Sequence, residues 1–301
     1  MANKGKYYES QFEEATIELL REAHWQYTFG DDIHRKYTDP LIEEDLRNFL
    51  AVQYKDKNLT TSEIDGIVAN LRNTGGQNDY YALRNAFLLY RDGYDFAYSD
   101  SRDNPFRMEY IDFEHPDHNI FRCVNQFVMG QGRENRRPDI LLFINGIPVC
   151  IIELKNPTKQ NATIRDAHTQ ICTRYMRDIP ALLKYCALAV ISDGAKNALG
   201  TTYTPFEFFY EWKKIENEDK AGKGLDTLRT LIRGALSPER ILEILRDYVY
   251  FPDPTKEDDT TEIVCRYPQF FATRKLREHI LNHLRSVGGD GKGGTYFGAT
   301  G

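Results

Sequence analysis

The chain has 301 residues, of which 41% are hydrophobic and 28% charged, with a formal net charge of −6. This composition indicates a folded globular protein with one large or two smaller domains. No apolar run is long enough to cross a bilayer, and residues 1–7 form no signal-peptide core, so we expect no membrane partner. The acidic balance disfavours a polyanionic partner unless a local basic patch, a metal ion or partner subunits help. Five scattered cysteines without a CxxC pair indicate free thiols in a reducing, cytoplasmic setting, not disulfides or a zinc site.

The first third of the chain is predicted to be mainly helical. Amphipathic spacing predicts a helix over 8–24, and residues 25–37 are expected to form a loop. Cap and stop signals then predict three more helices, over 40–54, 61–71 and 79–90. These three helices are expected to form an insertion, about residues 40–92, that carries no chemically marked side chain.

The middle of the chain changes to strand patterns. Aromatic and β-branched residues predict strands over 107–113 and 119–129, followed by a hairpin, a helix over 163–177 and a buried strand over 185–192. The order is helix, three or four mostly antiparallel strands, helix, strand. It predicts an α/β core in which helices pack against a mixed sheet.

The hairpin at residues 136–155 is the most informative stretch. Two apolar runs flank Asn145-Gly146, which is a strong signal for a tight turn, and both runs are apolar throughout, which indicates strands covered on both faces. Asp139 opens the first run, and Glu153 and Lys155 close the second. Charges at the rim of a buried hairpin are unfavourable unless paired, coordinated or used, so the three form either a structural salt bridge or a functional site.

These three residue types suit metal-assisted hydrolysis of a phosphodiester. Asp139 and Glu153 would hold Mg²⁺ through hard oxygen ligands, and the ion would activate a water molecule. Lys155 would orient that water and stabilise the charge that develops on the phosphate.

Three further side chains are secondary candidates for the same site. Gln170 and Tyr175, on the helix after the hairpin, could contact phosphate, or could be a solvent-facing Gln and a core Tyr. Glu13 could add a carboxylate, although a solvated helix face with the neighbouring glutamates is the simpler interpretation.

The register of the hairpin provides a sharper prediction. A two-residue turn pairs Ile144 with Ile147 and places Asp139 opposite Ile152, so Glu153 would face the other way. A shared metal site therefore requires a bulge, a different loop length or strong splaying near Asp139, and we predict one of these. An unbroken two-residue hairpin would contradict the metal site.

The C-terminal part is expected to start a second domain. A helix is predicted over 237–248, a Pro-containing acidic linker over 251–262, and a strand-like piece with a basic helix over 263–284. Residues 298–301, Gly-Ala-Thr-Gly, match the first half of a GxxxxGK[ST] phosphate loop. The alternative is a flexible Gly-rich tail.

Several ordered blocks of the sequence resemble the nuclease core of the endonuclease and motor subunit of type I restriction enzymes, which belongs to the PD-(D/E)xK nucleases. The blocks are VNQF at 124–127, RRPD at 136–139, NGIP at 145–148, IELKNP at 152–157, RDIP at 177–180, ISDG at 191–194 and RYPQFFA at 266–272. The resemblance covers most of the chain and extends beyond the three charged residues.

The resemblance implies a Mg²⁺-dependent DNA endonuclease domain over 1–250, then the start of a RecA-like motor domain over 263–301 that is cut within its Walker A loop. It implies double-stranded DNA and the modification and specificity subunits of the complex as partners. ATP would serve only the full-length protein, with Gln269 as the adenine-contacting residue and Gly298 and Gly301 in the phosphate loop.

The chain departs from the family pattern at one place. The family commonly places a Gln four residues before a Tyr on the helix after the hairpin, whereas Gln170 precedes Tyr175 by five, with Ile171 at the expected position. On an α-helix the two side chains would diverge by about 140°. Either a helix bulge realigns them or only one of them serves the site.

Two other functions remain open alongside the endonuclease. The domain could be a docking module for the motor and modification subunits without cleavage of its own, with a structural acidic pair. It could also be a stand-alone repair or junction nuclease of the same fold. The intact Asp139, Glu153 and Lys155 favour the endonuclease over the docking module, and the partial phosphate loop disfavours the stand-alone enzyme.

Overall fold

The computed structural model describes residues 3–100, 102–130, 135–155, 163–216, 222–252 and 260–295, with the backbone alone for 3–9. The helices are α1 Asn3–Glu22, α2 Glu43–Gln53, α3 Thr61–Asn73, α4 Asp79–Asp92, α5 Ile164–Thr169, α6 Met176–Asp178, α7 Pro180–Leu183, α8 Leu225–Leu231, α9 Pro238–Asp247 and α10 Tyr267–Asn282. The strands are β1 Gln26–Phe29, β2 Tyr94–Phe96, β3 Phe106–Met108, β4 Phe121–Asn125, β5 Ile140–Ile144, β6 Ile147–Leu154, β7 Leu188–Ser192, β8 Asn197–Gly200, β9 Val249–Tyr250 and β10 Ile263–Val264.

A six-stranded mixed sheet forms the centre of the molecule, in the order β1-β4-β5-β6-β7-β8. The β1–β4 and β6–β7 pairs are parallel and the other pairs are antiparallel. Every residue of β5, β6 and β7 is buried. The predicted α/β class and the full burial of the hairpin are therefore confirmed.

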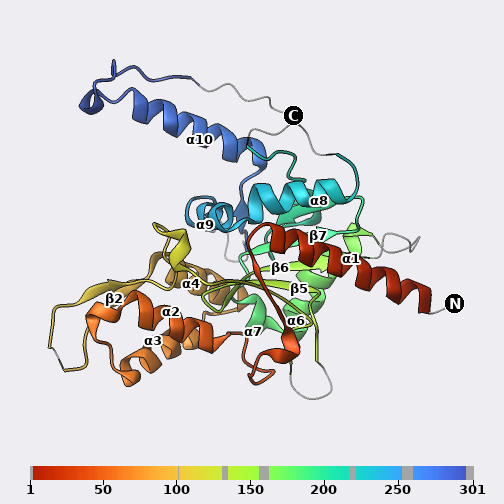
Figure 1. Ribbon diagram of the computed structural model, residues 1–301, viewed down its shortest axis with the longest axis horizontal. Helices are drawn as coiled ribbons and strands as arrows, with labels where there is room; N and C mark the ends of the chain where they lie inside the picture. The colour runs from red at the N-terminus through yellow and green to blue at the C-terminus, as the bar shows by residue number, and fades with distance from the viewer. Residues whose placement is uncertain are drawn as a thin grey trace.

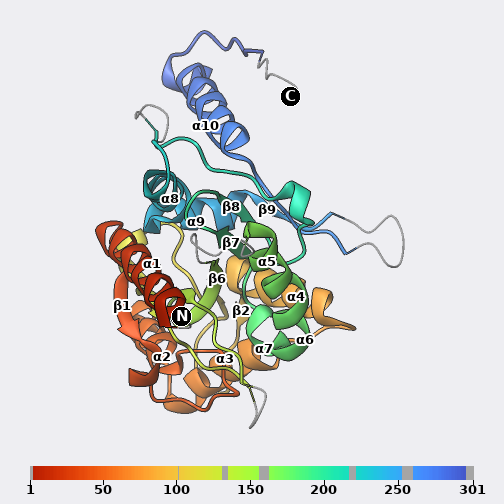
Figure 2. The same ribbon diagram turned by 90° about the vertical axis from the view of Figure 1, so that its right-hand side faces the viewer.

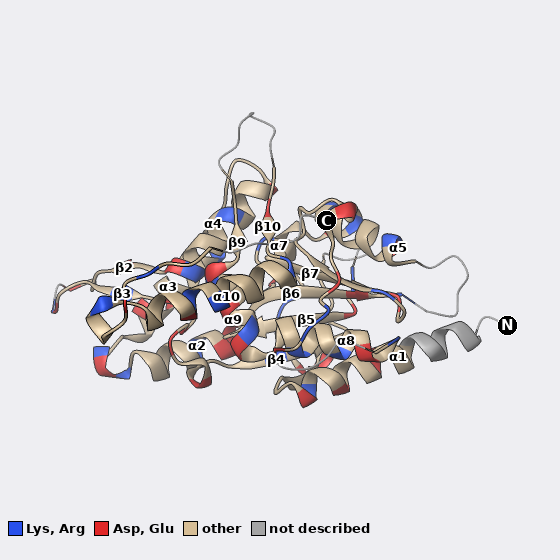
Figure 3. Cartoon of the chain, turned by 90° about the horizontal axis from the view of Figure 1, so that it is seen from above, with Lys and Arg blue, Asp and Glu red and all other residues tan. Residues whose placement is uncertain are grey.

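Helices cover both faces of this sheet (Figures 1 and 2). On one face, Leu142 and Ile152 belong to a large apolar cluster with residues of α1 to α4, α8 and α9. On the other face, Leu141 and Ile151 pack against residues of α5 and α7, including Ala167. Figure 3 shows Lys, Arg, Asp and Glu mainly on the surrounding helices and loops. The middle strands are therefore buried and rigid, and a charged side chain at the end of one of them is held in a fixed position.

Some elements differ from the sequence-based expectations. The expected loop at 25–37 contains β1, which joins the sheet edge beside β4 by pairing Gln26 with Arg122. The strand expected over 107–113 is limited to β3, which pairs with β2 outside the main sheet. For β1, the pairing partner is distant in sequence. For the 107–113 segment, a pairing partner is absent along most of its length. Local propensity reports neither.

The C-terminal helix α10 projects from the rest of the molecule in Figures 1 and 2. Phe270 anchors its first turn, with ring centroids 5.4 Å from Trp212 and 5.0 Å from Tyr248. Of the expected linker, residues 253–259 lie outside the described part of the chain, and Glu262 is buried at 2% exposure. The division into nuclease domain, linker and motor domain stays a prediction. Among the described residues, no helix is long and apolar enough to cross a membrane.

Candidate active site

A bulge in the β5–β6 hairpin decides which side chains share a face. Asn145 and Gly146 both have positive φ values, 51° and 78°, as a tight hairpin turn requires, and Ile144 pairs with Ile147 as predicted. The register then shifts, so that Val149 is an extra residue on β6. Val149 and its neighbour Cys150 both pack in the same apolar cluster. In a regular strand, successive side chains point to opposite faces of the sheet, so these two would lie on different faces. The predicted bulge is confirmed.

The bulge brings the two acidic side chains to the same face of the hairpin. Beyond it, Ile140 pairs with Ile152, so the next positions, Asp139 and Glu153, lie opposite each other. The backbone N–H of Leu154 donates a 2.7 Å hydrogen bond to Asp139 Oδ2 and holds this carboxylate against β6. Burial, and next the negative charge of Glu153, raise the pKa of Asp139 well above its ordinary value, although the Leu154 hydrogen bond opposes this.

Lys155 lies beside the acidic pair, directly after β6. Its Nζ donates 2.7 Å hydrogen bonds to Glu153 Oε1 and to Gln170 Oε1. Its backbone N–H donates to the carbonyl of Ser192, which ties the strand end to β7. The Lys155 side chain is 14% exposed and that of Glu153 is 1% exposed, so the ammonium group is fixed at the boundary between core and solvent. A cation held in this way can face a substrate without searching many rotamers.

A π-helical turn over Gln170–Tyr175 brings the next two candidates together. The amide Nε2 of Gln170 donates a 2.6 Å hydrogen bond to the hydroxyl of Tyr175, and that hydroxyl donates to Glu153 Oε2 at 3.2 Å. A π-helix bonds residue i to residue i+5, so five-residue spacing here puts both side chains on one side. The helix bulge named among the alternatives for this spacing is present, and Ile171 at the intervening position is buried in the core.

Burial and proximity to Glu153 raise the pKa of the Tyr175 hydroxyl, so it remains protonated and acts as a hydrogen-bond donor. Glu153, Lys155, Gln170 and Tyr175 thus form a continuous chain of hydrogen bonds. Such a network restricts each member to one rotamer.

Glu13 of α1 lies at the edge of this site, and the expected solvated helix face is wrong for it. Whereas Glu14 and Glu18 are exposed, Glu13 is partly buried. Its carboxylate accepts hydrogen bonds from Asn125 Nδ2 at 2.6 Å and from Gln126 Nε2 at 3.2 and 3.3 Å. Its charge also contributes to raising the pKa of Asp139.

Two amides that sequence reasoning assigned no role, Asn125 and Gln126, hold Glu13 in place. Asn125 is the last, buried residue of β4, and Gln126 follows it with a φ of 53°, which is uncommon for a residue other than glycine. Gln126 Oε1 also accepts a hydrogen bond from Arg137, two residues before Asp139. In the sequence, two adjacent amide residues at the end of an apolar strand were the feature that could have identified them.

Asp139 and Glu153 fit a hard divalent cation. Both offer carboxylate oxygens, the donors that Mg²⁺ prefers, and they occupy opposite positions on neighbouring strands. Burial, and next the charge of Glu153, disfavour the ionised form of Asp139 by raising its pKa, and a bound cation would offset both effects.

The residues proposed for nucleotide binding are placed only in part. Gln269 is exposed in the first turn of α10, where its Oε1 accepts a hydrogen bond from the backbone N–H of Arg266 and caps the helix. Gly298 and Gly301 lie outside the described residues. Their role with ATP stays a prediction.

Comparison with known proteins gives consistent matches. A family model described as "Type I restriction enzyme R protein N terminus" matches residues 6–208. The chain is 28% identical over 285 residues to the type I restriction enzyme HindI endonuclease subunit of Haemophilus influenzae, covering 91% of this chain and 27% of that protein. It is 28% identical over 305 residues to a Methanocaldococcus jannaschii protein provisionally named type I restriction enzyme MjaIXP endonuclease subunit, covering 90% of this chain and 28% of the other. The chain thus spans little more than a quarter of the length of these relatives.

Proposed function

The chain belongs to the family of type I restriction enzyme R protein N-terminal domains, and from this premise we propose that it is a Mg²⁺-dependent DNA endonuclease domain. The observation that carries the proposal is the Val149 bulge, because it places Asp139 opposite Glu153 with Lys155 beside them. Two carboxylates on opposite faces of the sheet could not bind the same metal ion.

Asp139 and Glu153 would hold the ion, and bound Mg²⁺ would lower the pKa of a water molecule and polarise a phosphoryl oxygen. Lys155 would hold the attacking water by hydrogen bonding and offset negative charge on the phosphate. Gln170 is a second hydrogen-bond acceptor for the Lys155 ammonium beside Glu153, and Tyr175 donates to the other oxygen of Glu153. This division leaves the lysine oriented before substrate arrives.

Double-stranded DNA is the proposed substrate, and the modification and specificity subunits of a type I complex are the proposed partners. The net charge of −6 supports DNA binding that is shared with other domains or subunits, because an acidic domain attracts a polyanion poorly by itself. A following RecA-like motor domain with ATP, using Gln269, and a cytoplasmic setting complete the proposal.

The docking-module alternative makes a different prediction about the same side chains. A structural acidic pair would be neutralised by a salt bridge, as Glu153 is by Lys155. Burial, and next the negative charge of Glu153, raise the pKa of the Asp139 carboxyl, and a purely structural pair gains nothing from either effect. This favours the endonuclease.

The test is DNA cleavage with Mg²⁺ by the full-length subunit in its complete complex, comparing wild type with Lys155→Ala. We expect cleavage to fall by about 10²-fold or more, while assembly and ATPase activity are unchanged. Lys55→Ala, at an exposed lysine of the turn after α2, is the matched control and should cleave normally. Cleavage that survives Lys155→Ala with assembly and ATPase activity unchanged would show that the catalytic assignment is wrong.

A further inference from the structure

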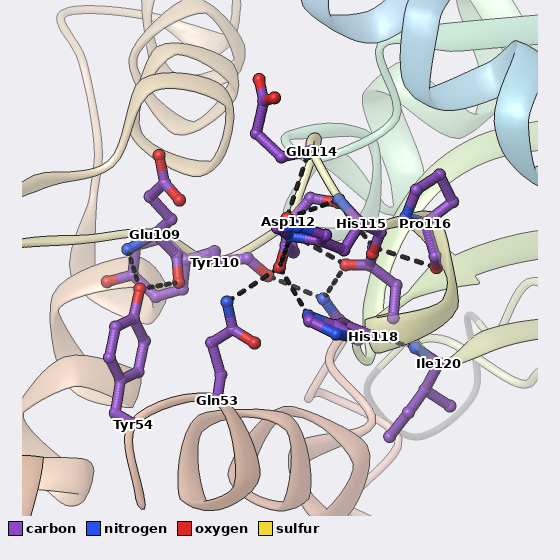
Figure 4. A network of polar contacts seen from close by, with 12 residues as sticks. Gln53, Tyr54, Glu109, Tyr110, Asp112, Glu114, His115, Pro116, His118 and Ile120 are labelled. Carbon is purple, nitrogen blue, oxygen red and sulfur yellow. Dashed lines mark hydrogen bonds and ion pairs between the residues drawn. The ribbon is translucent and has the colours of Figure 1, made fainter. Parts of the chain in front are cut away.

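The loop between β3 and β4 holds a second cluster of metal-binding side chain types, away from the candidate active site. Asp112, His115 and His118 lie on this loop (Figure 4). Asn145, in the turn of the β5–β6 hairpin, donates to the carbonyl of Tyr110 at 3.0 Å and ties the loop to that turn. The cluster therefore lies at the turn end of the hairpin whose open end carries Asp139 and Glu153.

The loop is held in one conformation by its own hydrogen bonds. Asn119 accepts from the backbone N–H of Asp112 at 2.9 Å and donates to the Asp112 carbonyl at 2.7 Å, closing the loop at both ends. The backbone N–H groups of Glu114 and His115 donate to Asp112 Oδ1 at 3.0 and 2.9 Å. The second carboxylate oxygen, Oδ2, therefore points at a defined position toward the imidazoles.

Both imidazoles present the same nitrogen to that oxygen. Nδ1 of His118 lies 2.9 Å from Asp112 Oδ2, and Nδ1 of His115 lies 3.4 Å from it. The two rings stack with centroids 4.7 Å apart, and all three ligand atoms lie within 4.8 Å of one another. From this arrangement we propose that Asp112, His115 and His118 form a binding site for a divalent transition metal ion, with Zn²⁺ as the reference case.

The donor set selects the class of ion. Two imidazole nitrogens with one carboxylate favour Zn²⁺ and its transition-metal neighbours over Mg²⁺, which prefers oxygen ligands. Each imidazole would bind through the Nδ1 lone pair of its neutral tautomer, with the ring proton on Nε2. The site thus differs in chemistry from the carboxylate pair of the active site.

The surroundings match a site with protein on one side and solvent on the other. The Asp112 side chain is 6% exposed, whereas those of His115 and His118 are 63% and 47% exposed, so water can complete the coordination. Gln53 of α2 donates a 2.9 Å hydrogen bond to Asp112 Oδ2 and helps to orient this ligand. An ion bound here would fasten the loop to α2 and stabilise the folded chain.

The test is calorimetric titration of the metal-free 301-residue chain with Zn²⁺. His279 on α10 and His283, directly after that helix, have ring centroids 4.0 Å apart and are a second pair able to bind the ion. Every measurement therefore uses a His279→Gln background. We expect one Zn²⁺ per chain, with affinity about 100-fold weaker in His118→Gln and about tenfold weaker in Gln53→Ala. Affinity within twofold of the background in His118→Gln would overturn the proposal, as would loss of all binding in the His279→Gln background.

A thermal measurement gives an independent readout. At free Zn²⁺ about 100 times the dissociation constant of the background chain, Tm should rise by roughly 5–10 °C in that chain and by no more than about 2 °C in His118→Gln. Because about half of the His118 side chain is exposed, this variant should keep the Tm of the background chain in EDTA, which separates lost binding from lost folding. An equal rise in both chains would also overturn the proposal. The outcome does not depend on DNA cleavage.

Discussion

Asp139 and Glu153 lie opposite each other because one extra residue, Val149, shifts the register of the hairpin between them. Side chains alternate along a strand, so a shift by one residue moves every later side chain to the other face. The placement of the two carboxylates therefore depends on a backbone irregularity ten residues from Asp139.

The burial of Asp139 beside the charge of Glu153 predicts that removing its charge stabilises the fold but impairs cleavage. The folded-state pKa of Asp139 is raised, so its stabilising contribution is present at low pH and is lost as pH rises through that pKa. Asp139→Asn keeps an oxygen that can accept from Leu154 but removes the charge. In EDTA at pH 8 the Tm of this variant should exceed that of wild type, while DNA cleavage falls by about 10²-fold or more.

Thermal unfolding with added Mg²⁺ provides the control for this variant. Mg²⁺ should raise the Tm of wild type and leave Asp139→Asn unchanged, since ligand that binds only the folded state stabilises it. An equal response of both proteins would place the ion elsewhere.

The π-helical turn predicts that one residue is dispensable. A π-bulge is a local departure from an α-helix, so deletion of Cys172 should restore regular α-helix and leave Gln170 and Tyr175 four positions apart on one face. Cleavage should stay within about threefold of wild type. Gln170→Ala, which removes the hydrogen bond to Lys155, should lower cleavage by about tenfold, the effect of one hydrogen bond to a charged group. If the deletion were as damaging as Gln170→Ala, the π-turn itself would be required.

The charge of Glu13 predicts a shift in pH dependence. Glu13 helps to raise the pKa of Asp139, so Glu13→Gln should lower that pKa and keep Asp139 ionised to a lower pH. The acidic limb of the cleavage profile should move to lower pH. Glu14→Gln, at an exposed neighbour, should leave the limb in place. A limb that moves equally in both variants would indicate only a general loss of negative charge.

Two glycines, one in the hairpin turn and one in α3, should respond in opposite ways to substitution by alanine. At Gly146 the φ is +78° and an added Cβ would lie 2.1 Å from the carbonyl oxygen of Ile42, so Gly146→Ala should lower the free energy of unfolding by at least about 2 kcal/mol. At Gly66, on the exposed face of α3, an added Cβ meets nothing within 4 Å. Gly66→Ala should raise the free energy of unfolding by about 0.5–1 kcal/mol. Urea unfolding of both variants measures the difference, and equal effects would contradict the strain argument.

The sequence alone determined the features that depend on neighbouring residues. The Asn145-Gly146 turn, the burial of both hairpin strands and the helices α3 and α4 all follow from local patterns of turn formers, apolar runs and caps. The charged residues at the hairpin rim were visible for the same reason, since Asp139 and Glu153 interrupt runs that are otherwise apolar.

Only the tertiary structure decided how these residues meet. In a strand that is apolar on both faces, nothing marks Val149 as the extra residue, since every neighbour is equally suited to burial. Glu13 has the helical context of an exposed glutamate until β4 brings Asn125 beside it, more than a hundred residues along the chain. Contacts between distant segments determine both the bulge at Val149 and the position of Glu13. The free energy that favours these arrangements comes from packing and desolvation between those segments, not from the local propensity of any one segment.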